Sequence, residues 1–176
     1  MTFHVVNSRI GWALPKKAPT EGEALVLPAN DHLWMGAGPG LDIKKAHGNE
    51  LELEAVRLGP IPLGGVAVTA GGPTGFTHLF HAVVSGQDLQ WVEGVGEKAV
   101  AAALAEAEKR KITALVFHPL YRGMHADKMA ATKEFLGAFL PVLEAGSSVK
   151  EITVIAQDED EWKLFQDLFL QLLTRA

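Results

Sequence analysis

Apolar runs of strand length alternate with helical stretches along most of this sequence, and the alternation limits what the chain can fold into. Residues 24–28 and 112–117 are short apolar runs typical of buried strands, and further strands are expected at residues 64–70, 77–84 and 151–156. Strands that alternate with helices favour an α/β fold with a mostly parallel sheet. Only a short turn separates residues 64–70 from 77–84, so part of the sheet should be antiparallel.

Three long helices are expected between these strands. Apolar residues at helical spacing predict them at Glu97–Lys111, Asp127–Leu143 and Glu159–Leu173. The second helix should turn the following residues inward: Met129, Leu136, Phe139, Leu140 and Leu143. We found no linker and no internal repeat, so all 176 residues are expected to form a single domain. Its N-terminal segment, residues 1–23, should be irregular with one or two edge strands.

Composition excludes several function classes. The chain has no cysteine, which excludes disulfides, thiolate nucleophiles and cysteine-based zinc sites. Its formal net charge is −5 and its basic residues are scattered, whereas nucleic-acid binding needs clustered Lys and Arg. No apolar run approaches the roughly 20 residues that span a bilayer. The N-terminus shows no signal-peptide pattern, so we expect a cytoplasmic protein that binds neither nucleic acid nor membrane.

A glycine-rich loop follows the first predicted strand. Gly36, Gly38 and Gly40 lie in this loop, and a short helix is expected to begin at Ile43 with Asp42 as its cap. Glycines let backbone N–H groups approach an anion, and the helix N-terminus adds partial positive charge, so the loop is a candidate phosphate cradle. A plain tight turn is the alternative. The spacing matches neither the G-x-G-x-x-G fingerprint nor a P-loop.

A second candidate loop follows the strand at residues 112–117. It runs from His118 to His125, and loops at the carboxyl ends of parallel strands commonly bind ligands in open α/β sheets. Arg122 could pair with a phosphate, and Tyr121 could stack on a base or a ribose. In the alternative interpretation, Arg122 is a solvated loop residue and His118 a core residue.

Neither a metal site nor a serine triad is indicated. His78 and His81 are three residues apart on one strand and should point to opposite faces. No serine lies in a G-x-S-x-G sequence. We therefore expect no metal and no cofactor.

Taken together, these segments resemble the macro domain family. Val26-Leu-Pro-Ala-Asn30 is similar to the family's V-N-A-A-N strand end, and the loop through Gly36, Gly38 and Gly40 is similar to its G-G-G-V loop. Residues 75–83 are similar to its V-I-H-T-V strand. Residues 117–123, with the sequence FHPLYRG, lie where the family has an F-P-x-L/I-x-T-G loop. The resemblance implies a three-layer α/β/α fold with a mixed, mostly parallel sheet, and binding of ADP-ribose or a related derivative.

The resemblance also implies which residues bind. Backbone amides of the two loops would hold the diphosphate, Asn30 would bond to the distal ribose, and Arg122 would add charge-assisted contacts. The implied ligand-binding residues are Asn30, Gly36, Ala37, Gly38, Pro39, Gly40, Leu41, Leu120, Tyr121, Arg122, Gly123, Met124 and His125.

The chain departs from the family pattern at several positions. Leu27 replaces the family's first Asn, and Lys16 occupies the place of the acidic residue that contacts adenine. Glu21, Glu23 and Asp31 are the acidic residues that could substitute for it. Members that hydrolyse ADP-ribosyl esters often carry Asp in the first loop, and the equivalent residue here is Gly40.

Three functions are therefore kept open. The first is a binding module for ADP-ribose or a related derivative. The second is a hydrolase acting on ADP-ribosyl esters, ADP-ribose phosphate or ADP-ribosylated protein, with Asn30 positioning a water and Asp42 or His125 accepting a proton. The third is a ligand-free interaction or assembly protein of the same fold, for which Trp12, Trp34 and Trp91 are candidate anchors. A homo-oligomer stays open in each case.

Overall fold

The computed structural model describes residues 2–5, 8–145 and 147–175, which form one seven-stranded sheet of order β1-β2-β7-β6-β3-β5-β4. The five inner strands are parallel to one another, while β1 and β4 pair antiparallel at the two edges. The strands are β1 (Thr2–Val5), β2 (Ser8–Ala13), β3 (Gly22–Asn30), β4 (Val66–Ala70), β5 (Phe76–Ser85), β6 (Ala114–Phe117) and β7 (Glu151–Ile155). The mixed, mostly parallel sheet and its antiparallel β4–β5 pair are as predicted.

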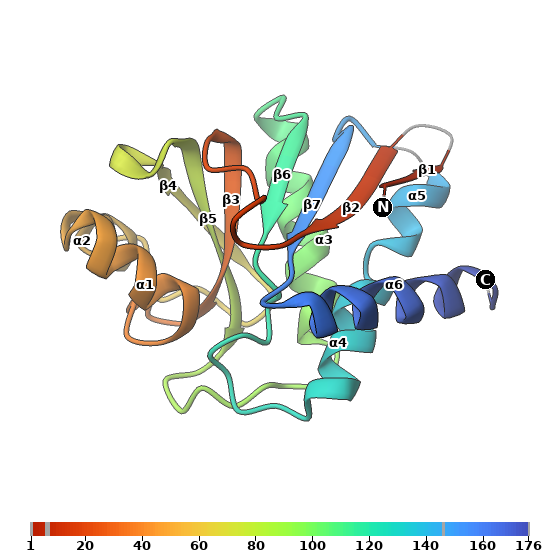
Figure 1. The fold of residues 1–176 in the computed structure, drawn as a ribbon. Coiled ribbons are helices and arrows are strands. Elements are labelled where there is room, and N and C mark those ends of the chain that lie inside the picture. The colour runs from red at the N-terminus through yellow and green to blue at the C-terminus, as the bar shows by residue number, and fades with distance from the viewer. Residues whose placement is uncertain (1, 6–7, 146, 176) are drawn as a thin grey trace.

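Helices cover both faces of the sheet and make three layers. Figure 1 shows α1 and α2 together on one side of the molecule and α4 and α6 on the other. The helices are α1 (Gly38–His47), α2 (Glu50–Val56), the 3₁₀ turn η1 (Gly72–Thr74), α3 (Val95–Lys109), α4 (Lys128–Gly137), α5 (Leu140–Ala145) and α6 (Glu159–Leu173).

Alternation along the strands divides the core between the two faces. In β3, Ala24 and Val26 face the cluster that packs against α3, α4 and α6, whereas Leu25 and Leu27 face the cluster beneath α1 and α2. Successive side chains of a strand point to opposite faces, so a fully apolar run such as residues 24–27 buries both of them.

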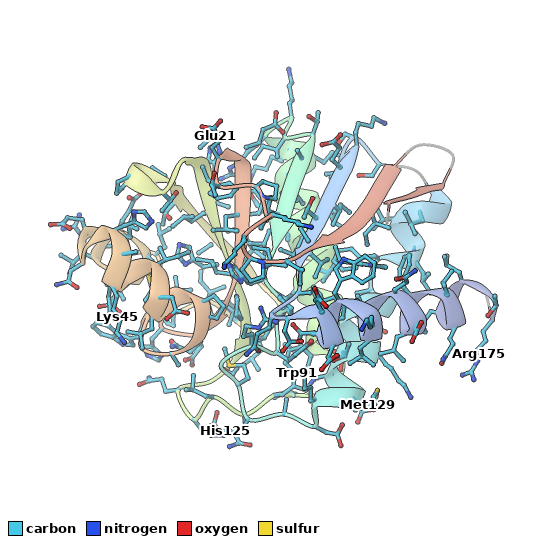
Figure 2. The ribbon with its side chains drawn as sticks, in the orientation of Figure 1. Glu21, Lys45, Trp91, His125, Met129 and Arg175 are labelled. Carbon is cyan, nitrogen blue, oxygen red and sulfur yellow. The ribbon has the colours of Figure 1, made fainter. Side chains whose placement is uncertain are left out.

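The predicted helix at residues 127–143 is wrong in two details. The chain breaks between α4 and α5, because Pro141 has no N–H and its ring would clash with the carbonyl of Gly137 in a continuous helix. Met129, expected to face inward, is 45% exposed at the start of α4 and lies at the outer surface in Figure 2. By contrast, α6 has the predicted bounds, and the carboxylate of Asp158 caps it by accepting the N–H of Glu161 at 2.8 Å.

The N-terminal segment is more regular than expected. β2 pairs in parallel with β7, from the other end of the sequence, and so lies inside the sheet rather than at its edge. Across the described part of the chain, no helix has the length and apolarity needed to cross a membrane.

Candidate functional site

The two predicted loops leave the sheet at the same edge. β3 and β6 are neighbouring parallel strands, with Val26 opposite Phe117, and the N–H of His118 donates to the carbonyl of Val26 at 3.0 Å. The loop after β3 leads into α1 and the loop after β6 leads towards α4. Both loops are therefore at the carboxyl ends of adjacent strands, where ligands bind in open α/β sheets.

The loops touch through two glycines. Gly38 and Gly123 both have positive φ, 54° and 83°, a conformation that side chains disfavour. A Cβ on Gly38 would lie 2.9 Å from the carbonyl oxygen of Arg122, and a Cβ on Gly123 would lie 2.7 Å from Cα of Gly38. This backbone contact brings the two turns to one place.

The first loop becomes helical earlier than expected. Gly38, Pro39 and Gly40 form the first turn of α1, with Ala37 as N-cap, so Asp42 lies inside the helix and does not cap it. Proline is compatible with a first helical turn because the N–H it lacks would have no intrahelical acceptor. Leu41 N–H donates to the carbonyl of Ala37 at 3.2 Å. Within residues 8–145 and 147–175, no acceptor is found for the N–H groups of Gly36, Ala37, Gly38 and Gly40.

The second loop uses several of its amides internally. Arg122 N–H donates to the carbonyl of Pro119, Met124 N–H to that of Tyr121, and His125 N–H to that of Leu89, at 3.0, 3.0 and 2.8 Å. Of the predicted anion donors in this loop, Leu120, Tyr121 and Gly123 have N–H groups without an acceptor among the described residues. This loop therefore offers fewer donors than the first.

The Tyr121 and Arg122 side chains do not face the other loop. The Tyr121 ring is buried in the core against Trp91 and Phe135, so its predicted stacking on a base or ribose is wrong. Burial raises the pKa of its hydroxyl, and the adjacent Glu161 carboxylate adds to the shift. The Arg122 guanidinium pairs with Glu161 and donates to the carbonyl of Ile155 at 3.3 Å. It thus has protein partners where a phosphate contact was expected.

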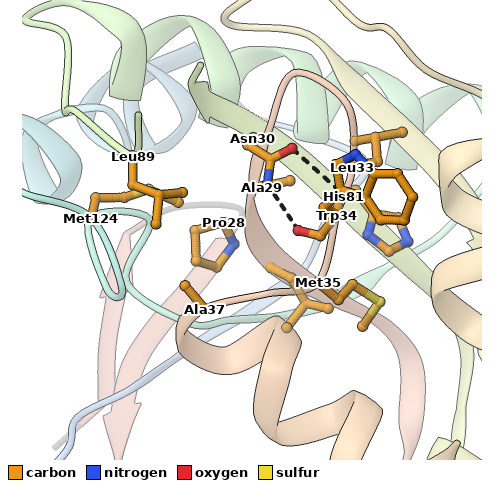
Figure 3. A pocket seen from close by; sticks show the side chains of 12 residues that line it. Pro28, Ala29, Asn30, Leu33, Trp34, Met35, Ala37, His81, Leu89 and Met124 are labelled. Carbon is orange, nitrogen blue, oxygen red and sulfur yellow. Dashed lines mark hydrogen bonds between the residues drawn. The ribbon is translucent and has the colours of Figure 1, made fainter. Parts of the chain in front are cut away.

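Asn30 clamps the turn between β3 and the first loop. Its Oδ1 accepts the N–H groups of His32 at 3.1 Å and Trp34 at 3.2 Å, and its Nδ2 donates to the carbonyl of Trp34 at 2.9 Å. Figure 3 shows the two bonds to Trp34. An amide side chain has two donor hydrogens and two acceptor lone pairs. The second N–H of the Asn30 amide has no acceptor among the residues that the structure describes.

A small cavity lies beside Asn30. It has a volume of about 10 Å³, enough for about one water molecule. Four predicted site residues line it: Asn30, Ala37, Gly40 and Met124. The other lining residues were not predicted as ligand-binding: Leu27, Pro28, Ala29, Leu33, Trp34, Met35, His81 and Leu89. In Figure 3, Leu89 and Met124 form the wall opposite Trp34 and His81.

Two leucines of this cavity have unusual backbone conformations. Leu33 and Leu89 have φ of 65° and 58°, which is uncommon for a residue with a branched apolar side chain. Such conformations cluster at functional sites, where the surrounding structure holds them. No local signal in the sequence distinguishes either leucine from an ordinary loop residue.

One buried and one half-buried histidine, His81 and His118, lie near the two loops. His81 forms part of the cavity wall, and its Nε2 lies 3.0 Å from the Thr69 hydroxyl. Burial lowers the pKa of His81 to about 4. Burial also lowers the pKa of His118 to about 4, and the Arg122 charge adds to this shift. Both imidazoles are therefore neutral at pH 7.

The other candidate catalytic and adenine-binding residues are less well placed. Asp42 and His125 are exposed, and neither lines the cavity. Glu21 and Glu23 cannot substitute for the missing adenine-binding acid, because they lie at the start of β3. Figure 2 shows Glu21 and His125 at opposite ends of the molecule. Asp31 follows β3 at the correct edge, and its Oδ1 lies 2.9 Å from Nδ1 of His32.

Glu23 instead joins strand ends at the far edge. Its carboxylate accepts the N–H groups of Ala114 and Thr113. Partial burial opposes its charge, but these bonds outweigh it and the pKa of Glu23 lies below its usual value. Across the residues the structure describes, no group of three or more His, Asp or Glu side chains gathers as a metal site would.

The three tryptophans considered as interface anchors differ in exposure. Trp12 is buried against Phe165 and Phe169 and is not a surface anchor. Trp91 is partly buried, and its Nε1 donates to Glu134 at 3.2 Å. Trp34 is 50% exposed beside the cavity. Of the three, Trp34 alone presents a large aromatic surface at the site.

The fold and the two joined loops define the class: an α/β protein with two touching loops and a small cavity at the carboxyl edge of its sheet. The Macro domain family model matches residues 26–135, and the chain belongs to the macro domain family. An uncharacterised protein of Pyrobaculum aerophilum is 29% identical over 154 residues, covering 85% of this chain and 84% of that one. An uncharacterised Aquifex aeolicus protein is 36% identical over 98 residues, covering 54% and 59% of the two chains.

Solved macrodomains share the fold. The Oceanobacillus iheyensis macrodomain with ADP superposes with a TM-score of 0.83 at 20% identity, covering 100% of this chain and 97% of that one. The Trypanosoma brucei macrodomain in complex with ADP-ribose gives a TM-score of 0.75 at 21% identity, covering 90% and 68%. These likenesses confirm the predicted three-layer macro-type architecture.

Proposed function

We propose that this chain binds ADP-ribose or a related ADP-ribose derivative, with the diphosphate between the loop at residues 36–41 and the loop at residues 120–125. Amides of Gly36, Ala37, Gly38 and Gly40 would supply most of the donors, and the N–H groups of Tyr121 and Gly123 the remainder. Asn30 would donate its one free N–H to the distal ribose. Family membership and the ligands of the two solved relatives support this proposal.

The observation that carries the proposal is the contact of Gly38 with Gly123. It places the free amides of a helix N-terminus beside a second turn at the carboxyl edge of the sheet. Amides held in this way are preorganised donors for an anion and need little reorganisation on binding. The chain itself we infer to be a single macro-type domain, since β2 and β7 join its two ends in one sheet.

Calorimetry with ADP-ribose, ADP, AMP and NAD tests the proposal. ADP-ribose and ADP should bind saturably. Asn30→Ala should lower the affinity for ADP-ribose by roughly tenfold or more, because it removes a donor and the bonds that hold the turn before the first loop. Asn49→Ala is the matched control: this exposed residue precedes α2 and makes no capping side-chain bond. Its affinity should equal that of the wild type.

Incubation with O-acetyl-ADP-ribose and with an ADP-ribosylated protein separates binding from hydrolysis. Saturable binding without turnover supports a binding module. Turnover that is lost in Asn30→Ala would make the chain a hydrolase. Failure to bind any adenine nucleotide would contradict the proposal and favour an interaction or assembly role.

A further inference from the structure

Glu161 is a buried carboxylate on which the second loop converges. Glu161 is 3% exposed. Its two carboxylate oxygens contact donors from three segments of the chain. Oε1 accepts the Tyr121 hydroxyl at 3.1 Å and lies 3.7 Å from Nζ of Lys128. Oε2 pairs with the Arg122 guanidinium and accepts the N–H of Gln157 at 2.6 Å.

The start of α6 holds this carboxylate in place. Asp158 caps the helix, and Glu161, three residues later, extends its side chain back to the N–H of Gln157. This resembles a capping box, in which the third helical residue bonds back to the chain before the helix. The start of α6 therefore fixes the carboxylate independently of its contacts with Tyr121 and Arg122.

Arg122 is fixed from two sides. Its guanidinium pairs with Glu161 and also donates to the carbonyl of Ile155, at the end of β7. If Arg122 turned to a phosphate, Glu161 would remain buried without its main counter-charge, which is strongly unfavourable. The backbone of Arg122 nevertheless lies at the site, because its carbonyl faces Gly38.

We propose that Glu161 is a positioning residue for the ligand: acting through Arg122 and Tyr121, it holds the turn at residues 120–123 in the conformation that packs Gly123 on Gly38. Arg122 is then a strut of the second loop and does not contact the anion. The inference rests on the proposed function for its ligand, but the state of the loop can be measured without one.

A double-mutant cycle distinguishes a strut from a ligand contact. Glu161→Gln and Arg122→Gln should each weaken ADP binding by about tenfold, a typical cost of losing a charged hydrogen-bond partner. If Arg122 acts through Glu161, the double variant binds no more weakly than Glu161→Gln alone. Equal losses from Arg122→Gln in both backgrounds would overturn the proposal.

Salt dependence supplies a second readout. A phosphate held by an exposed guanidinium binds less tightly as salt screens the pair. Because Arg122 is already paired, Arg122→Gln should leave the slope of ADP affinity against NaCl concentration unchanged. A shallower slope in that variant would show direct contact with the anion and contradict the proposal.

Hydrogen exchange measures, without a ligand, whether Glu161 holds the turn at residues 120–123 in place. In Glu161→Gln, the Met124 and His125 amides should exchange at least about tenfold faster, while those of β3 keep their wild-type rates. Glu23→Gln, which alters a carboxylate at the opposite edge of the sheet, should change neither these rates nor ADP affinity. Unchanged amide exchange in Glu161→Gln would contradict the positioning role of Glu161. A wild type that binds no nucleotide would contradict only the proposed function.

A milder variant protects the test from misfolding. Tyr121→Phe removes the hydroxyl, with its bonds to Glu161 and Thr132, and keeps the buried ring. This variant should fold, and its affinity for ADP should be about two- to threefold lower, in line with the loss of one neutral donor. An affinity equal to the wild type, together with unchanged loop exchange, would show that Tyr121 takes no part in the positioning.

Discussion

The two loops at the carboxyl edge of the sheet are similar in position but differ in how their polar groups are used. In the first, Gly36, Ala37, Gly38 and Gly40 keep their N–H groups free of acceptors within the described residues, and Pro39 helps to begin the helix. In the second, the N–H groups of Arg122, Met124 and His125 and the side chains of Tyr121 and Arg122 are bonded within the protein. The first loop is therefore built to donate, whereas the second is built to hold a shape.

This division explains why the cationic residue of the second loop is a poor guide to the ligand. Arg122 is close to Gly38 through its backbone, yet its charge is directed to Glu161 on α6. The donors that remain for an anion in both loops are neutral amides. The comparison predicts that geometry, more than net charge, determines affinity at this site.

Forcing the two loops apart should have the largest effect on stability and on ADP-ribose affinity. Gly38→Ala and Gly123→Ala each place a Cβ within 3.0 Å of backbone atoms of the other loop, at a positive φ. Each should lower the free energy of unfolding by roughly 1–3 kcal/mol and weaken ADP-ribose by about tenfold or more. Chemical denaturation and calorimetry measure the two effects.

Gly36→Ala is the matched control, because a Cβ there meets no atom within 4 Å and no positive φ is involved. It should match the wild type in the free energy of unfolding. If Gly36→Ala lowered the free energy of unfolding as much as Gly38→Ala, contact between the loops would not be the cause of the destabilisation.

Lowering the pH should weaken the supports of both loops. His81 and His118 have an ordinary pKa of 6.5 and a pKa of about 4 in the folded chain. Between these values the unfolded chain takes up protons that the folded chain does not, so stability is lost as pH falls from about 6.5 towards 4. From pH 7 to pH 5, each histidine should remove up to about 2 kcal/mol from the free energy of unfolding.

Urea titrations at the two pH values check this. His81→Gln and His118→Gln should each show a smaller loss than the wild type, while the exposed His47→Gln on α1 should follow the wild type. If only His118→Gln reduced the loss, the first loop would not depend on a neutral His81. A wild type equally stable at both pH values would contradict the burial of both rings.

Much of the fold followed from local patterns. The apolar periodicity of residues 159–173 predicted α6 with its bounds, and the parallel strands predicted that the two loops would share an edge. α2 was missed because it has seven residues and buries only Leu51 and Ala55, too short a pattern to detect. Gly38–Gly40 was expected to be irregular, since glycine disfavours helices, but Pro39 suits the first turn of a helix that packing holds in place.

The parts of the site that sequence could not predict depend on distant partners. Tyr121 and Arg122 looked available for a ligand because their partner, Glu161, follows them by about forty residues in a different element. Glu23 is a different case: it directly precedes the predicted strand at residues 24–28 and so lies at the end opposite the glycine-rich loop. The errors at Tyr121 and Arg122 concern side-chain direction, which only tertiary contacts determine.

Substitution of Lys128 should have the smallest effect on stability. It tests whether the contacts that hold Glu161 extend beyond Tyr121 and Arg122. Its Nζ lies 3.7 Å from Oε1 of Glu161, but its side chain is 62% exposed. Exposed ion pairs contribute little, so Lys128→Ala should change the free energy of unfolding by less than about 0.5 kcal/mol and leave ADP-ribose affinity unchanged. Thermal unfolding at low and high salt, with the neighbouring exposed Lys133→Ala as control, measures this. A loss comparable to that of Glu161→Gln would mean that the buried carboxylate depends on Lys128 as well as Arg122, and the second loop would then be held by a wider charge network.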